Sequence, residues 1–126
     1  MVPVMRLVLD SDPRIHLVRS YGGGEIVIAE QRFARPLIVT PQRLIADWSA
    51  TSLSELAEAQ LQALFDLGAG IVLLGAGEAQ TFASPAVRAS FRARNIALEC
   101  MTLGAACRTY NILANEERPV AAALFP

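Results

Sequence analysis

The sequence predicts an α/β domain in which a mixed sheet is flanked by helices. The first third alternates apolar and polar residues, as strands do, around the glycines Gly22-Gly23-Gly24. The second half alternates short apolar runs with amphipathic segments, in the order strand, helix, strand, helix, strand. Strands joined through a helix are normally parallel, whereas those of a hairpin are antiparallel. The sequence therefore predicts an antiparallel hairpin section followed by a β-α-β-α-β unit.

Length and composition indicate one folded domain. The chain has 126 residues, of which 53% are hydrophobic and 18% are charged, a balance that can offset the entropy lost on folding. We expect a single domain over 1–126 with its core at about 14–125. The 11 basic and 12 acidic side chains leave a net charge of -1, which gives no electrostatic reason to expect nucleic-acid binding.

The N-terminal section is predicted to be extended. Ile15 and Leu17 share one face, and Gly22-Gly23-Gly24 permits a sharp reversal into the apolar run 25–28. A third extended run, over 36–40, ends at Pro41, whose missing amide hydrogen discourages further pairing. His16 is expected on a strand surface.

The segment after Ser52 predicts the first helix. Ser52 stands three residues before Glu55, which is the spacing of a capping box. Gly68 supplies the left-handed residue that commonly ends a helix, and Ile71 to Leu74 is wholly apolar, as in a buried strand. The apolar side of this helix would consist of Leu53, Leu56, Ala57, Leu61 and Leu64.

The remaining elements follow the same alternation. Ser84-Pro85 is an N-cap followed by a first-turn proline, and Val87 with Phe91 forms the apolar ridge of a helix that ends near Asn95. We then expect a strand over 96–101, a helix over about 105–114 and a strand over 120–124.

Two loops at strand ends form the candidate binding site. Gly75-Ala76-Gly77 and Thr102-Leu103-Gly104 follow apolar runs, and ligands of open α/β sheets tend to lie beyond the carboxyl ends of strands. If the strands are neighbours, the amides of 105–107 are free helix donors for a small anion or carboxylate. Alternatively, the glycines only turn the chain and the alanines allow close packing. The candidate binding residues are Gly75, Gly77, Thr102, Gly104, Cys107, Arg108 and Asn111.

Cys107 is the candidate nucleophile. A helix N-terminus and the neighbouring Arg108 would lower the pKa of its thiol. No base stands near Cys107 in the sequence, however, and free cysteine is commonly core material. Asn111 would cap a turn or bond the Gly75 loop, and Arg108 would hold a partner's carboxylate or stay solvated. We assign no catalytic residue, and these observations favour a protein that is not an enzyme.

The cysteines and the single histidine indicate neither a metal site nor a disulfide scaffold. Cys100, Cys107 and His16 are too few for a zinc cluster or a histidine-based centre, so we expect no metal and no cofactor. The N-terminal residues lack the pattern of a signal peptide, and no apolar run reaches the length of a membrane span. We expect a cytoplasmic protein.

The segment Gly104 to Asn111, reading GAACRTYN, carries a family resemblance. Together with other matching segments it resembles the small α/β family that includes the mitochondrial complex I assembly factor and an adipogenesis-associated protein with an Mth-type domain. The likeness covers about 15–124 and implies a three-layer α/β domain with a mixed central β-sheet, without a secure enzymatic activity or established cofactor. The other matches are 73–77, 82–85, Tyr21-Gly22, Trp48 and 120–124.

The chain departs from the family pattern at two places. Ala76 stands where the glycine loop usually carries threonine, and Thr102-Leu103 stands where an acidic-threonine pair is frequent. If those hydroxyl and carboxylate groups do chemistry in relatives, this chain lacks them. Mitochondrial relatives need a presequence that this sequence does not show, which is consistent with a bacterial cytoplasmic member.

Three functional hypotheses follow. The leading one is a non-catalytic accessory domain that binds another protein, an assembly factor that the resemblance links to respiratory complex I. The alternative is a small-molecule or anion-binding protein, or a weak enzyme, with its site at the carboxyl ends of two adjacent strands. The third is a structural module that forms a homodimer.

Overall fold

The computed structural model describes residues 4–7, 14–79 and 82–126. Its strands are β1 (Met5–Arg6), β2 (Val18–Gly22), β3 (Glu25–Ile28), β4 (Gln31–Phe33), β5 (Leu37–Val39), β6 (Leu44–Ile45), β7 (Ile71–Ala76), β8 (Ala97–Met101) and β9 (Val120–Phe125). Its helices are the 3-10 helix η1 (Leu53–Glu55), α1 (Glu58–Phe65), α2 (Pro85–Ala93) and α3 (Leu103–Asn115).

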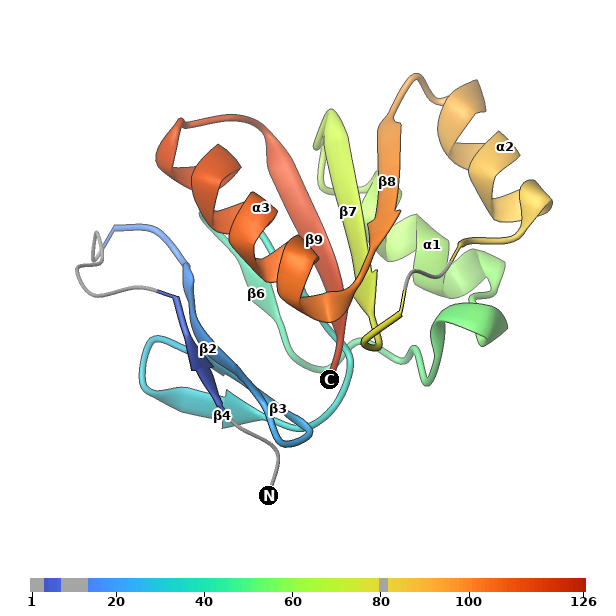
Figure 1. Ribbon diagram of the computed structural model, residues 1–126. Coiled ribbons are helices and arrows are strands. Elements are labelled where there is room, and N and C mark those ends of the chain that lie inside the picture. Colours follow the sequence, from blue (N-terminus) through green and yellow to red (C-terminus); the bar gives the residue numbers. More distant parts are fainter. Residues whose placement is uncertain (1–3, 8–13, 80–81) are drawn as a thin grey trace.

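The described elements form three layers around a mixed sheet, which confirms the predicted fold class (Figure 1). The central sheet has the strand order β6-β5-β9-β7-β8, in which β7 is parallel to β8 and β9, and β5 is antiparallel to β9. Helices α1 and α2 cover one face of this sheet. Helix α3 and a separate antiparallel sheet, β1-β2-β3-β4, cover the other face.

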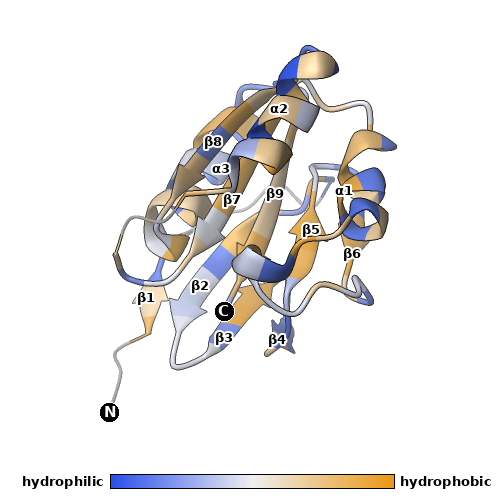
Figure 2. Ribbon diagram, turned by 90° about the vertical axis from the view of Figure 1, so that its right-hand side faces the viewer, coloured by the Kyte–Doolittle hydropathy of each residue, from blue (hydrophilic) through white to orange (hydrophobic). Residues whose placement is uncertain are grey.

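Strand β9 lies inside the central sheet and is buried along its whole length. Val120, Ala122 and Leu124 face the core that contains α3, whereas the alternate residues face the core under α1 and α2. A strand covered on both faces must be apolar throughout, which explains the run of alanine and leucine. Figure 2 shows apolar residues gathered along β5 and β7, and mixed polar and apolar residues along α1.

The predicted hairpin is confirmed, but it belongs to a sheet of its own. Strands β2 and β3 are antiparallel and turn at three glycines with positive φ, Gly22, Gly23 and Gly24. Strands β1, β4 and β6 were not predicted from the sequence. The turn from β3 to β4 runs through Ala29 at φ 55°. Alanine seldom adopts a positive φ, so its presence in the sequence does not predict a turn here.

His16 is not on a strand, contrary to the prediction, because β2 begins only at Val18. The backbone N–H of His16 donates to the carbonyl of Pro41 at 2.9 Å, and its carbonyl accepts from the Tyr110 hydroxyl at 2.6 Å. Both backbone groups are thus bound by segments that are distant in the sequence.

The predicted start of the first helix is wrong. The hydroxyl of Ser52 lies 3.2 Å from that of Ser54 and makes no capping bond, and the chain forms only the short helix η1 before Leu56 turns extended. Helix α1 starts after Ala57, whose N–H donates to the Gln60 side chain at 2.8 Å. Its end at Gly68, with φ 70°, agrees with the prediction.

The later elements agree with the sequence analysis. Ser84 accepts a hydrogen bond from the Val87 N–H at 3.2 Å, as an N-cap should, and Pro85 is the first residue of α2. Val87 and Phe91 are buried against the sheet. Strands β7, β8 and β9 fall on the predicted apolar runs.

Replacing Gly75 with alanine should destabilise the fold. A Cβ at this position would collide with the Cβ of Ala106 and lie 3.3 Å from Leu124, because β7 and α3 are in close contact there. We expect a loss of about 1–3 kcal/mol, as for other overpacked cores, measured by urea denaturation. The control is Gly70→Ala, where the nearest atom is 3.9 Å away. Equal stability of the two variants would contradict this packing.

Candidate functional site

The two predicted loops meet at the carboxyl edge of the central sheet. Strands β7 and β8 are parallel neighbours with Gly75 opposite Met101. Beyond them, the N–H of Leu103 donates to the carbonyl of Gly77 at 3.0 Å. The expected contact between the loops is therefore present in the structure.

The helix donors at this edge are not free, contrary to the prediction. Thr102 is the N-cap of α3, and its hydroxyl accepts from the Ala105 N–H at 3.2 Å. The carbonyl of Thr102 accepts from the Ala106 N–H at 2.9 Å. Cys107 is the fifth residue of α3, where the regular helical bond already reaches Leu103. Threonine is a favoured N-cap because it satisfies such donors. These backbone N–H groups are therefore not available to bind an anion.

An open pocket of about 510 Å³ lies between this edge and the β2–β3 hairpin. Four predicted site residues line it, namely Gly77, Thr102, Gly104 and Arg108. No sequence signal pointed to the other described lining residues, which are Met5, Tyr21, Gly22, Gly23, Gly24, Glu78, Leu103, Phe125 and Pro126. The hairpin glycines signalled only a turn, because nothing in the sequence placed them beside α3.

Tyr21, Gly104 and Arg108 form one wall of the pocket. A Cβ at position 104 would collide with the Tyr21 hydroxyl and lie 2.8 Å from Cζ, so the tyrosine ring rests on the bare backbone of α3. One turn further along α3, Nη1 of Arg108 donates to the Tyr21 hydroxyl at 3.0 Å. The absence of a side chain at Gly104 thus allows Tyr21 to reach Arg108.

Gly75, Cys107 and Asn111 do not line this pocket. Gly75 is buried beneath α3, where its missing side chain allows close packing. Asn111 neither caps a turn nor reaches the Gly75 loop. Its Nδ2 donates to the carbonyl of Val18 at 2.8 Å, and its Oδ1 accepts from the Val18 N–H at 2.9 Å. Asn111 therefore fastens α3 to β2.

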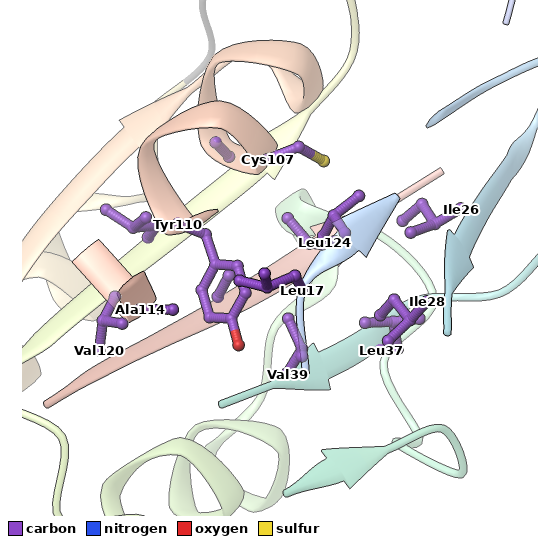
Figure 3. Packing of buried hydrophobic residues seen from close by; sticks show 14 residues of the cluster. Leu17, Ile26, Ile28, Leu37, Val39, Cys107, Tyr110, Ala114, Val120 and Leu124 are labelled. Carbon is purple, nitrogen blue, oxygen red and sulfur yellow. The ribbon is translucent and has the colours of Figure 1, made fainter. Parts of the chain in front are cut away.

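Cys107 is fully buried in the core between α3 and the two sheets (Figure 3). Burial raises the pKa of its thiol from 9.0 to about 12, and the charge of Arg108 offsets this only in part. The expected lowering of the pKa is wrong because desolvation outweighs the nearby charge. The thiol is therefore neutral at physiological pH and is not an activated nucleophile.

Two further features concern metal binding and membrane insertion within the described residues 4–7, 14–79 and 82–126. No three histidine, cysteine, aspartate or glutamate side chains in these ranges come together as ligands for a metal ion. Nor does any helix in them have the length and apolar character needed to cross a bilayer.

Removing the Asn111 amide should weaken the attachment of β2. Asn111→Ala leaves the N–H and the carbonyl of Val18 buried without their partners, and each such loss costs about 1–3 kcal/mol. We expect a large drop in the free energy of unfolding, measured with urea. Asn115→Ala, at the exposed end of α3, is the control and should change stability by less than about 0.5 kcal/mol. A similar loss in both variants would refute this role.

The buried thiol should make stability fall at alkaline pH. In the unfolded chain Cys107 loses its proton near pH 9.0, whereas in the folded chain it keeps it up to about pH 12. The folded state then binds more protons, so the free energy of unfolding falls as pH rises through this window, by up to about 1.4 kcal/mol per pH unit. Cys107→Ala should show a shallower decline in urea unfolding between about pH 8 and about pH 10.5. Parallel curves would contradict the raised pKa.

Known proteins resemble this chain in sequence and in structure. It is 29% identical over 122 residues to NADH dehydrogenase (ubiquinone) 1 alpha subcomplex assembly factor 3 of Bos taurus, and the match covers 95% of this chain and 66% of the relative. The chain thus spans slightly less than two thirds of that relative's length. The expected similarity to the complex I assembly factor is confirmed.

Solved structures show the same fold. A protein of Xanthomonas campestris is 37% identical with a TM-score of 0.81, over 93% of this chain and 90% of the other. A Mth938-like domain of Bordetella pertussis is 26% identical with a TM-score of 0.79, over 97% and 92% of the two chains. The model of one family, described as "Protein of unknown function (DUF498/DUF598)", matches residues 18–125. This chain belongs to that family.

Proposed function

We propose that the protein is a non-catalytic, cytoplasmic accessory domain that binds another protein during assembly of a respiratory NADH dehydrogenase. The observation that carries the proposal is the relationship to a NADH dehydrogenase assembly factor over 95% of this chain. Because a shared fold alone does not fix function, the proposal depends on the sequence similarity to this relative along nearly the whole chain.

The state of Cys107 supports a non-catalytic role. This residue occupies the place where a nucleophile would benefit from a helix N-terminus and an arginine, yet its side chain is fully buried and its pKa is raised. Forming a thiolate would place a negative charge in apolar surroundings, which favour the neutral thiol. Catalysis by this thiol is therefore disfavoured.

The edge strand β8 supports a protein partner. This strand ends the central sheet and pairs only with β7 among the described strands, so its outer backbone groups are available to an added strand. Glu99 is exposed at its centre. In an antiparallel pairing of two copies centred on Glu99, two like charges would face each other. This edge therefore favours a different protein with a basic residue opposite Glu99 over a homodimer.

Affinity capture from the source organism should recover NADH dehydrogenase subunits or assembly intermediates with the tagged protein. Glu99→Arg should reduce this recovery several-fold, because it reverses the charge at the centre of the free edge. Glu116→Arg, an exposed position at the end of α3, is the matched control. Absence of these subunits from the wild-type capture, measured by quantitative mass spectrometry, would contradict the proposal.

Deletion of the gene should lower assembled NADH dehydrogenase activity in membranes while succinate dehydrogenase activity stays unchanged. Complementation with the wild type and with Cys107→Ala should restore the activity equally, because the thiol has no chemical role in the proposal. Failure of a folded Cys107→Ala variant to complement would favour an enzyme instead.

A further inference from the structure

We propose that the pocket between the β2–β3 hairpin and the start of α3 binds a small monocarboxylate with an apolar body. The guanidinium of Arg108 and the hydroxyl of Tyr21 would hold the carboxylate, and Leu103 with Met5 would contact the apolar part. This inference goes beyond the proposed assembly role and does not depend on it.

Arg108 has unused capacity to bind an anion. A guanidinium has five N–H donors, and Arg108 donates from Nη1 to the Tyr21 hydroxyl. Among the described residues, no acidic side chain forms an ion pair with Arg108. Its side chain is exposed and lines the pocket, so a carboxylate can approach it from solvent.

Tyr21 adds a second donor at the same place. Its hydroxyl accepts from Arg108, which leaves the hydroxyl hydrogen free to donate to an anion. The backbone of Tyr21 is held between β1 and β3, where it pairs with Met5 and Ile26, and its ring rests on Gly104. Because these contacts already fix the position of the side chain, binding would require little further ordering of it.

The rest of the pocket suits a small apolar body. Leu103 is half-buried and Met5 is exposed, so both present apolar surface at the pocket wall. On the opposite wall, a Cβ at Gly23 or Gly24 would meet nothing within 4 Å, so the hairpin leaves open space. The volume of about 510 Å³ falls within the range of small-molecule sites.

The charges at the pocket favour one negative charge on the ligand. Arg108 and Glu78 are the charged side chains among the described lining residues. Arg108 attracts a carboxylate, whereas Glu78 would repel a second anionic group. The amides of Ala105 and Ala106 cannot help to neutralise a dianion, because Thr102 already accepts from both. A monocarboxylate therefore fits better than a phosphate or a dicarboxylate.

NMR titration of the intact protein tests the proposal. The probe is 4-phenylbutyrate, with the uncharged 4-phenylbutanamide as its matched control. We expect the acid to shift the amide resonances of Gly23, Gly24 and Gly104 and to leave Gly68, which is far from this pocket, unchanged. The amide control should bind at least about tenfold more weakly, because it lacks the charge that strengthens a bond to arginine.

Two substitutions assign the contacts. Arg108→Gln should weaken binding of 4-phenylbutyrate at least about tenfold, and Tyr21→Phe, which keeps the ring on Gly104, should weaken it about threefold to tenfold. Arg92→Gln, on the exposed face of α2, is the control and should bind like the wild type. Equal affinity of Arg108→Gln and Arg92→Gln, or equal binding of the acid and the amide, would overturn the proposal.

A further titration with a tripeptide distinguishes two sources of the carboxylate, the end of a polypeptide and a free small molecule. Acetyl-Ala-Ala-Phe with a free carboxyl group is compared with its carboxamide. Preference for the tripeptide acid over 4-phenylbutyrate would assign the carboxylate to the end of a polypeptide, and the reverse preference would assign it to a free small molecule. These titrations use the isolated protein, so their outcome is independent of the capture and deletion experiments.

Discussion

The attachment of the hairpin sheet to α3 is the constraint on which the rest of this structure depends. Asn111 pairs with both backbone groups of Val18, and the Tyr110 hydroxyl donates to the carbonyl of His16. These bonds join residues 93 and 94 positions apart. They lie in or beside a core in which unpaired backbone groups would be costly. Together they fix β2 against α3, and β2 in turn carries Tyr21 to the pocket.

Small residues at the layer contacts make this attachment possible. Gly75 and Ala106 let α3 lie close to β7, and Gly104 lets the Tyr21 ring rest on the helix backbone. The small alanine side chains of β9 allow the layers on both faces to approach the centre of the sheet closely. Close packing of this kind gains dispersion energy over many contacts, and it makes single added methyl groups costly.

At the carboxyl edge of the central sheet, some residues at the start of α3 serve only packing, whereas others line the pocket. Thr102 accepts hydrogen bonds from backbone N–H groups in the first turn of α3, and Cys107 is buried with a raised pKa. The backbone and the thiol at this helix start therefore have a structural role. The polar groups that remain available to a ligand are the guanidinium of Arg108, one turn further along α3, and the hydroxyl of Tyr21 on β2. The anion-binding potential of the site therefore comes from side chains brought together by the fold.

The sequence alone determined most elements of the second half, because Ser84-Pro85, Gly68 and the apolar runs act through local backbone chemistry. It also indicated Gly77, Thr102, Gly104 and Arg108 as neighbours at one edge. It did not determine the roles of Asn111 and Cys107, the second sheet, or the part that Tyr21 plays in the pocket. These depend on contacts between residues up to 94 positions apart. Such contacts arise only when tertiary packing decides which side chains are buried, because local residue patterns carry no information about distant partners.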